Sequence, residues 1–449
     1  MKKVFICLIL FLFVVPIALI GMGCKPAETT ATEAEEVEAV PEKVTEEEVK
    51  KEQVALEIWD SEDREPAKIA WDYLLQEFKK EYPYITVEVA SVSWGDMFTK
   101  VEAGLKTDTL PDILMSWGSL PPQFARMGAI QPITDVIEDI GEDQFPVSAM
   151  KYYKFDGEYI AMPVAIYTDV LFYRSDVYKE LGLEAPTTWD EVLENSKAIM
   201  DNTDMYGFGL YMAEHEADIF YGLMGCNDGA IVGPDGESIT INSPETIEVL
   251  EYLKELYKYS SADMLVKSAG DVRVLVTEGN VGQILTSTSF CANIQSLEDT
   301  SMEFSAVTFP TNKGNRGAMF NPVTYEITKS TDHPEEAKLL LKFMCRDDIA
   351  LEFHKLYIPG HVPALKSVNE NEEFWNSPNV IDLVDIIQAG VTANEKAILA
   401  AQELGPNSVS GVIMGTGVVG SMVQKVLLDG WDPQEALEWC EQNLIEALE

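Results

Sequence analysis

The sequence is poor in basic residues, histidine and cysteine. Its 449 residues include 32 Lys and Arg against 76 Asp and Glu, which gives a formal net charge of -44. Because phosphate contacts require clustered Lys and Arg, this balance argues against nucleic acid as a partner. Four histidines and six cysteines leave little material for metal or nucleophile chemistry. We therefore expect no catalytic residue, no metal and no cofactor, although 46% apolar residues suffice for a core.

The cysteines beyond residue 24 do not form a metal-binding pattern. They are Cys226, Cys291, Cys345 and Cys440, and no C-x-x-C pair occurs among them. Two of the few histidines, His354 and His361, stand seven residues apart without a third ligand in view. Export would permit disulfides, and four cysteines allow three pairings. Buried free thiols are the alternative, and the sequence leaves both open.

The N-terminus is a targeting segment. Lys2 and Lys3 precede an apolar run over residues 4–20, and small residues lead to Cys24. The arrangement resembles a bacterial lipoprotein signal, except that Gly21 stands where Leu is usual. The resemblance implies cleavage before Cys24 and its acylation, which would hold the chain at the membrane surface. An ordinary cleaved signal and an uncleaved anchor are the alternatives, and each of the three exports residues 25–449.

Residues 25–53 have the composition of a disordered tether. They contain ten Glu, four Lys, two Pro and no aromatic residue, which is too little apolar surface to offset the entropy of ordering. Without Lys2, Lys3 and this tether the net charge is -40, so the folded part carries most of the acidity.

From residue 54 onward the hydrophobic pattern alternates between strand and helix. Strand-like runs occur at 54–59, 85–89 and 111–115, with helical spacing at 67–78 and 98–105 between them. This β-α-β-α-β order predicts an α/β fold with a parallel sheet covered by helices. Further strand-like runs lie at 170–173 and 325–328.

Helix starts carry their own signals farther along the chain. Thr188 with Glu191 forms a capping box pattern, and Ser243-Pro244 and Asp432-Pro433 place a cap before an N1 proline. Pro334 opens another apolar-periodic segment. The literal G-x-G-x-x-G at 415–420 has only 29 residues after it, too few for a dinucleotide-binding fold, so we predict a tight loop with close helix packing.

A series of short motifs from residue 54 onward resembles the extracellular solute-binding proteins of ABC importers, in particular the sugar-binding type related to maltodextrin-binding proteins. The series comprises L-E-I-W at 56–59, F-x-x-x-Y-P-x-I-x-V at 78–87, L-P-D-I at 110–113, G-A-I-Q-P-I at 128–133, D-G-E-Y at 156–159 with L-F-Y-R at 171–174, P-T-T-W-D-E at 186–191, and Y-E-I-T at 325–328 with P-E-E-A at 334–337. No single motif is specific for this family. The order and spacing of the whole series are. Arg174 stands where Asn is usual.

The resemblance implies a two-lobed periplasmic-binding-protein (Venus-flytrap) fold, each lobe a sheet flanked by helices. We expect lobe 1 to comprise residues 54–162 and 318–366, and lobe 2 residues 163–317 and 367–449, with crossings near Pro163, Ala318 and Lys366. A ligand in the cleft between the lobes would stabilise their closure, and permease subunits in the membrane would recognise the closed form. The resemblance thus implies a monomeric binding protein, periplasmic or on the outer face of the cell membrane.

Candidate ligand contacts follow from two premises. Sugars need flat apolar faces and planar polar groups, and ligands of α/β sheets lie beyond the carboxyl ends of strands. The candidates are Trp59, Asp60, Asp63, Arg64, Trp94, Ser116, Trp117, Tyr167, Phe290 and Asn321. The resemblance places Asp63 and Arg64 at a sugar-contacting acid-base pair, and Tyr167 where a contacting Glu is usual. The structural alternative for each aromatic residue is a place in the core.

Other functions compete with carbohydrate capture. The ligand could be a polyol, a glycerol phosphate or a polyamine, and the binding protein could serve a sensor. A secreted glycoside hydrolase is a remote alternative, because abundant acids allow a catalytic carboxylate pair. The sequence does not identify the sugar, its length or its linkage.

Overall fold

The computed structural model describes residues 52–213, 215–299, 301–314, 317–407 and 409–449. The predicted signal segment with Cys24 lies outside these residues, as does the predicted tether apart from Glu52 and Gln53. The described residues belong to one compact unit, Lys51–Glu449.

Strands predicted from the sequence are confirmed, and the sheet contains more of them. They are β1 (Val54–Asp60), β2 (Ile85–Ser91), β3 (Ile113–Trp117), β4 (Lys154–Phe155), β5 (Glu158–Tyr159), β6 (Met162–Arg174), β7 (Gln283–Ser287), β8 (Phe304–Thr308), β9 (Phe320–Ile327) and β10 (Val362–Pro363). β1 pairs in parallel with β2 and β3, as the β-α-β-α-β pattern predicts. β9 lies antiparallel between β3 and β6, so the sheet is mixed.

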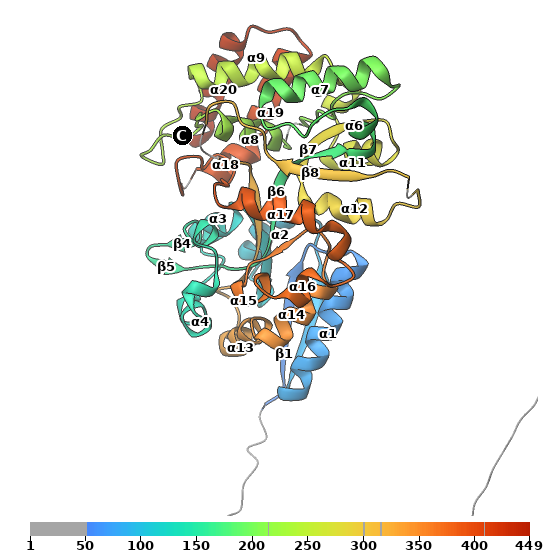
Figure 1. Ribbon diagram of the computed structural model, residues 1–449. Coiled ribbons are helices and arrows are strands. Elements are labelled where there is room, and N and C mark those ends of the chain that lie inside the picture. Colours follow the sequence, from blue (N-terminus) through green and yellow to red (C-terminus); the bar gives the residue numbers. More distant parts are fainter. Residues whose placement is uncertain (1–51, 214, 300, 315–316, 408) are drawn as a thin grey trace, which may run out of the picture. The chain divides into compact units, whose positions relative to one another are not determined.

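Strand β6 is shared by two groups of strands. From Met162 to Thr168 it pairs with β9, and Ala165 and Ile166 also pair with β10; from Asp169 to Arg174 it pairs with β7 and β8. We call the group β10-β6-β9-β3-β1-β2 the first branch and the group β7-β6-β8 the second branch (Figure 1). The predicted lobe boundaries stay a proposal, which the change of partners between Thr168 and Asp169 supports.

Helices cover both branches. They are α1 (Glu65–Glu81), α2 (Met97–Thr107), α3 (Leu120–Met127), α4 (Thr134–Ile140), α5 (Val147–Met150), α6 (Ser175–Leu181), α7 (Trp189–Asn202), α8 (Asp218–Cys226), α9 (Pro244–Tyr257), α10 (Ala262–Leu265), α11 (Ala269–Thr277), α12 (Cys291–Gln295), α13 (Pro334–Met344), α14 (Asp347–Leu356), α15 (Lys366–Asn369), α16 (Glu372–Trp375), α17 (Val384–Asn394), α18 (Ser410–Thr416), α19 (Val418–Leu427) and α20 (Pro433–Leu448). Short 3-10 turns are η1 (Glu142–Gln144), η2 (Thr288–Phe290) and η3 (Ile381–Leu383). α1 and α13 pack on the first branch, and α11 and α17 pack on the second.

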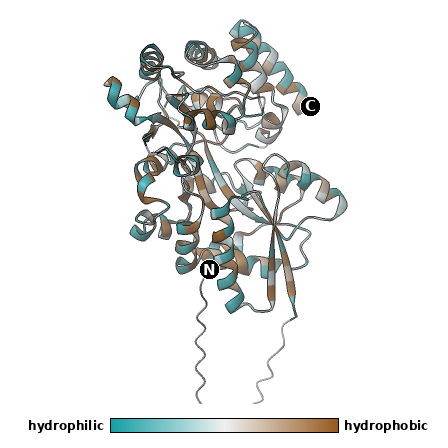
Figure 2. Ribbon diagram, turned by 90° about the vertical axis from the view of Figure 1, so that its right-hand side faces the viewer, coloured by the Kyte–Doolittle hydropathy of each residue, from teal (hydrophilic) through white to brown (hydrophobic). Residues whose placement is uncertain are grey.

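The inner strands of the first branch are buried on both faces. Leu56 and Ile58 of β1 enter the main core cluster, whereas Trp59 enters a second cluster that also holds Leu114 and Phe124. This alternation follows from the period of two along a strand. Strands are accordingly mostly hydrophobic, whereas the helices carry hydrophilic outer faces (Figure 2). Both faces of the sheet are therefore closed, and a ligand must bind at its edges or ends.

The predicted helix starts are confirmed. Thr188 and Glu191 form a capping box at α7, and the side chains of Ser243 and Asp432 accept backbone N–H groups at α9 and α20. The G-x-G-x-x-G segment joins α18 to α19 through Gly417, whose φ of 68° is left-handed, and this confirms the tight loop. Among the described residues no single helix could cross a membrane by length and composition, while the bent pair α18–α19 passes that test together.

Candidate ligand site

The segment after β1 is held by a buried aspartate. Asp60 is 1% exposed, and its carboxylate accepts hydrogen bonds from Trp71 Nε1 at 2.9 Å, Tyr325 Oη at 2.7 Å and the Glu62 backbone N–H at 2.7 Å. Burial raises the pKa of Asp60 to about 6, although these donors offset part of the rise. Asp60 therefore fixes the path of the chain beyond β1, and its own oxygens face protein groups.

Arg64 forms an ion pair that the sequence analysis did not foresee. Its Nε and Nη2 donate to the two carboxylate oxygens of Glu62, each at 2.6 Å. The Glu62 side chain is 2% exposed and that of Arg64 is 39% exposed, so the guanidinium faces outward from a buried anchor. Asp63, expected to be the acidic partner, is exposed. The partner is Glu62, two positions before Arg64.

Arg64 opens onto a cavity of about 470 Å³. Segments that are remote in sequence line it: the start of α1, the end of α11, helix α12 and the loop after α14. The lining residues are Arg64, Pro66, Thr277, Ala292, Asn293, Gln295, Ser296, Leu297, Ile358 and Pro359. Because α1 packs with the first branch and α11 with the second, this cavity joins the two branches.

Tyr167 of β6 is a buried residue whose ring centroid lies 6.4 Å from that of His361. It is 6% exposed, and its hydroxyl has no hydrogen-bond partner among the described residues. Burial raises the pKa of Tyr167 well above its usual value, and the charge of Arg64 offsets part of that rise, so the two groups are close. Burying a hydroxyl without a hydrogen-bond partner destabilises the protein. A hydrogen bond to a ligand hydroxyl or a water would offset this loss of free energy.

A pair of histidines supports the loop beside the cavity. His361 Nδ1 lies 2.6 Å from the Ile358 carbonyl oxygen, and His361 Nε2 lies 2.9 Å from His354 Nδ1. Since a carbonyl only accepts, His361 donates from Nδ1 and accepts at Nε2 from His354. Burial lowers the pKa of His361 to about 4. The pair is therefore neutral at pH 7 and fixes Ile358, a cavity residue.

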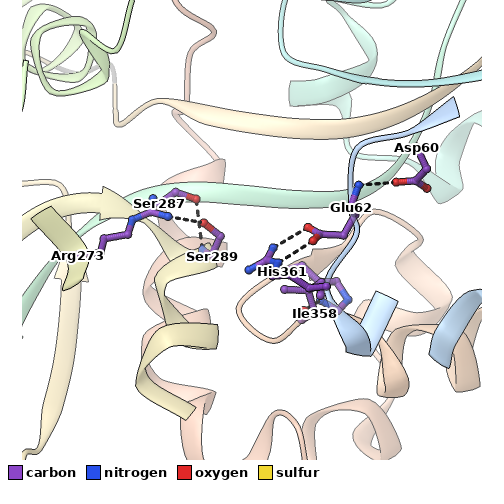
Figure 3. Close-up of polar contacts among 8 residues, drawn as sticks. Asp60, Glu62, Arg273, Ser287, Ser289, Ile358 and His361 are labelled. Atoms are coloured by element: carbon purple, nitrogen blue, oxygen red, sulfur yellow. Dashed lines mark hydrogen bonds and ion pairs between the residues drawn. The ribbon is translucent and has the colours of Figure 1, made fainter. Parts of the chain in front are cut away.

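The second branch contributes a polar wall. Arg273 of α11 donates from Nε to Thr286 Oγ1 at 2.8 Å and from Nη1 to Ser289 Oγ at 3.2 Å. Figure 3 shows Arg273, Ser287 and Ser289 on one side, with Glu62, Ile358 and His361 facing them from the other. The sequence analysis missed Arg273, because a single Arg on a short helix has no recognisable pattern.

Trp94 and Trp117 form an aromatic pair beyond β2 and at the end of β3. Their ring centroids lie 4.6 Å apart at 63°, and Trp94 is 39% exposed. Ser116 beside them is fully buried and bonds Thr324 at 3.3 Å. Asn321 is half-buried, with its Oδ1 close to Gly118. The pair offers a partly exposed apolar face.

Two other candidates pack in the interior. Phe290 is fully buried, with Phe172 at 5.1 Å and Phe304 at 6.0 Å between ring centroids. Trp59 is 6% exposed beneath Lys100, whose Nζ lies 4.5 Å from the ring centroid. Both arrangements favour the structural alternative of a core residue. The four cysteines of the described residues are free thiols, and no cluster of metal ligands occurs in that part of the chain.

The chain thus has an α/β architecture in which two sheet branches share strand β6 and a cavity is lined by elements packed on both branches. Solved structures with this architecture match the chain closely. An ABC transporter solute-binding protein from Thermotoga lettingae bound with α-D-tagatose gives a TM-score of 0.76 at 20% identity, over 88% of this chain and 100% of that one. A maltose-bound protein from T. maritima gives 0.73 at 20% identity, over 88% and 99%. These likenesses establish the periplasmic-binding-protein fold.

The chain belongs to the bacterial extracellular solute-binding protein family, whose profile matches residues 64–350. A putative ABC transporter periplasmic-binding protein of Escherichia coli K12 is 23% identical over 409 residues, which cover 88% of this chain and 93% of that one. An arabinooligosaccharide-binding protein of Halalkalibacterium halodurans is 22% identical over 296 residues, covering 62% and 63%. The protein is therefore an extracytoplasmic solute-binding component of an ABC importer, a class that binds without catalysis.

Proposed function

We propose that the chain captures a carbohydrate in the cavity between the two branches and delivers it to an ABC importer. The observation that carries the proposal is the buried, unpartnered hydroxyl of Tyr167, which lies close to Arg64 of a cavity that both branches line. A ligand that contacts both branches binds the closed conformation more tightly than the open one, and it therefore stabilises the closed conformation. The names of several similar proteins, one of them in complex with ribitol, support a sugar or a polyol as the ligand.

The expected contacts divide into two kinds. Trp94 and Trp117, which lie outside the lining of the cavity, supply apolar faces for the C–H surfaces of a sugar ring that extends beyond it. Arg64, Tyr167 and Asn321 supply hydrogen-bonding groups, with Arg64 held in place by Glu62. Ser116 and Asp60 bond inside the protein and position their neighbours.

Acylation of Cys24 would hold the protein at the membrane, and this part of the proposal rests on the sequence of residues 1–24 alone. Labelling of cells with an alkyne fatty acid should mark the wild-type protein and leave the Cys24→Ser variant unlabelled. Equal labelling of both would refute acylation at this residue.

Tyr167→Phe tests the ligand site. The variant keeps the ring and removes the unpartnered hydroxyl, so we expect unliganded stability to be unchanged or slightly higher. We expect affinity for a bound sugar to fall about 10-fold, the effect of one lost hydrogen bond. Thermal unfolding with mono- and oligosaccharides, ribitol, glycerol 3-phosphate and spermidine identifies the ligand class, and calorimetry measures the affinities.

Tyr173→Phe is the matched control, because Tyr173 lies farther along the same strand with its ring 4.3 Å from that of Tyr178. Its affinity should equal that of the wild type. Unchanged affinity in Tyr167→Phe would remove Tyr167 from the site. Stabilisation by spermidine or glycerol 3-phosphate alone would replace the carbohydrate by a charged solute.

A further inference from the structure

Two buried histidines hold the loop after α14 closed. His354 Nδ1 lies 2.9 Å from His361 Nε2, and the centroids of the two rings lie 5.0 Å apart. The rings are 2% and 1% exposed. His361 also bonds inside the loop, through Nδ1 to the Ile358 carbonyl oxygen at 2.6 Å (Figure 3). We call His354 and His361 the histidine pair, and residues 357–360 between them the loop.

The loop connects the two branches. A Cβ built on Gly360 would lie 2.0 Å from the Thr288 carbonyl oxygen and 2.8 Å from the Cys291 Cβ, so the loop backbone packs directly on η2 and α12. At the other end of the loop, α14 packs on α1 of the first branch. Ile358 and Pro359, which stand between these two contacts, line the cavity. The position of the loop therefore determines both a wall of the cavity and a contact between the branches.

Neutral rings surround the histidine pair. The ring centroids nearest to that of His361 are those of Tyr357 at 5.3 Å, Phe374 of α16 at 5.7 Å and Tyr167 of β6 at 6.4 Å, and Phe353 lies 5.5 Å from His354. Burial raises the pKa of the two tyrosines and of the Cys291 thiol, so all three groups stay neutral in acid. In the part of the chain that the structure describes, no carboxylate bonds either histidine.

The charged groups around the pair already have partners or face solvent. Asp60 and Glu62, whose charges act on Tyr357, accept hydrogen bonds from Trp71, Tyr325 and Arg64, and Arg273, whose charge acts on Cys291, donates to Thr286 and Ser289. The helices packed against α14 carry their charges at the surface: Glu352 with Lys355 on α14 itself, Lys366 with Glu370 on α15, Glu372 and Glu373 on α16, Asp72 on α1, and Lys338 and Lys342 of α13 with Asp135 and Asp139. A proton taken up by the pair would therefore have no counter-charge.

Protonation is incompatible with the present contact. His361 donates from Nδ1 and accepts at Nε2, which requires a neutral ring. One imidazolium would be a buried charge among aromatic rings, and two would place N–H donors against each other across 2.9 Å. Burial accordingly lowers the pKa of His361 to about 4, and burial and the charge of His361 lower that of His354.

The sign of the effect on the loop follows from these directions. A histidine in an opened loop regains its ordinary pKa of 6.5, so the closed loop binds fewer protons than the open one. The closed state is fully favoured above pH 6.5, and this preference is lost as the pH falls toward 4. For His361 alone, the equilibrium constant for opening should rise about 30-fold between neutral pH and about pH 5.

We propose that His354 and His361 form an acid-sensitive switch, in which proton uptake breaks the hydrogen bond between the rings and releases the loop from Thr288 and Cys291. Release would remove one wall of the cavity and one contact between the branches. This inference goes beyond the proposed function, because the switch acts in the unliganded protein.

Cys291 reports the state of the loop. It is a free thiol, fully buried, and Gly360 covers it. The experiment treats the unliganded protein with dithiodipyridine, which modifies thiols in acid, and mass spectrometry identifies the modified cysteine. Relative to free cysteine at the same pH, modification of Cys291 should accelerate about 30-fold between neutral pH and about pH 5, because its rate follows the population of the open loop. Cys226 and Cys440, buried in α8 and α20, should stay unmodified.

The double variant His354→Gln with His361→Gln removes both titrating rings, while its amides can still donate and accept. The rate of Cys291 modification in this variant should change less than about 3-fold over the same pH range, because no group of the pair then takes up a proton. His215→Gln is the matched control, since it makes the same chemical change at an exposed position, and it should behave as the wild type. Should the double variant fail to fold by circular dichroism, each single variant tests the switch, and its acceleration in acid should be smaller than that of the wild type.

Two results would overturn the switch. One is an acceleration in acid that is equal in the wild type and in the histidine-pair variants. The other is modification of Cys226 and Cys440 in step with Cys291, which would mean that acid unfolds the whole protein. Both results leave the proposed function standing, because ligand binding by the wild type and Tyr167→Phe at neutral pH tests that function separately.

Discussion

A buried acid whose pKa is shifted makes the stability of a protein depend on pH. Glu326 of β9 is fully buried in the middle of the first branch, opposite Leu114. Neither carboxyl oxygen bonds a described residue, and burial raises the pKa of Glu326 to about 8, although the hydroxyls of Thr324 and Ser116 stand near enough to offset part of the rise. Glu326 is therefore mostly a neutral acid at pH 7.

Glu326→Gln should make folding less sensitive to pH. The pKa of Glu326 is higher in the folded chain than its ordinary value of 4.5, so its protonated form favours folding. In the wild type, the contribution of protonated Glu326 to the free energy of unfolding is fully present below pH 4.5 and is lost as the pH rises toward 8. We expect the advantage of Glu326→Gln to grow over this window, by up to roughly 5 kcal/mol at ~1.4 kcal/mol per pKa unit. Urea unfolding at the two ends of the window measures it.

The exposed Glu88→Gln of β2 is the control, since it makes the same chemical change without burial. The difference in unfolding free energy between Glu88→Gln and the wild type should stay nearly constant over that pH range. A Glu326→Gln variant whose advantage is also constant would show that Glu326 ionises freely in the folded protein.

At this scale the sequence predicts residue types better than it predicts partners. Arg64 lines the cavity as expected, yet its partner is Glu62 and not Asp63. Phe290 is aromatic and near the site in sequence, but its ring turns into the core. The wall residue Arg273 reaches Ser289 only because α11 packs beside β7. Such contacts depend on packing between remote segments, which the pattern of one segment cannot contain.

Elements are predicted well where their signals are local. Thr188, Ser243 and Asp432 each mark a helix start because a cap acts on the next three residues. Strand β6 shows the opposite case. Only residues 170–173 read as a strand, whereas the structure continues it over 13 residues through both branches. Its partners β7, β8, β9 and β10 come more than 100 residues later, and so the pairing has no local signal.

The loop after α14 joins the two branches at Gly360. This residue has a φ of 93°, and a Cβ built on it would lie 2.0 Å from the Thr288 carbonyl oxygen of η2. Backbone therefore packs on backbone here, next to the cavity residues Ile358 and Pro359. Only glycine permits both the conformation and the approach.

Gly360→Ala should separate this contact. We expect the free energy of unfolding to fall by roughly 2–4 kcal/mol, because strain and a backbone clash add. Gly182→Ala is the control: its φ is 68°, but nothing lies within 4 Å of the new Cβ, so only the conformational penalty of about 1 kcal/mol applies. Urea unfolding compares the two. Equal losses would mean that the loop moves away from Thr288 without penalty, and the contact would then contribute nothing to joining the branches.

Across the whole molecule, acids outnumber bases by more than two to one. Many of the basic side chains already serve exposed ion pairs, such as Lys106 with Glu102 and Lys197 with Asp201, and pairs of this kind contribute little. With 76 acids and 32 bases, more than half of the acids have no basic residue to pair with one to one. Such an excess promotes solubility while it destabilises the compact state through self-repulsion.

Added salt should consequently stabilise this protein. Screening shortens the range of repulsion from ~30 Å at 0.01 M to ~8 Å at physiological ionic strength, which favours the folded chain because its charges are closer together than those of the unfolded chain. We expect the melting temperature to rise by a few degrees, corresponding to about 1–2 kcal/mol, between low and physiological ionic strength. Scanning calorimetry in NaCl and in KCl measures the effect. Screening acts through ionic strength alone, so the two salts should give the same rise. A rise in only one of them would indicate specific cation binding, and a flat response would mean that the carboxylates are spaced widely enough not to repel.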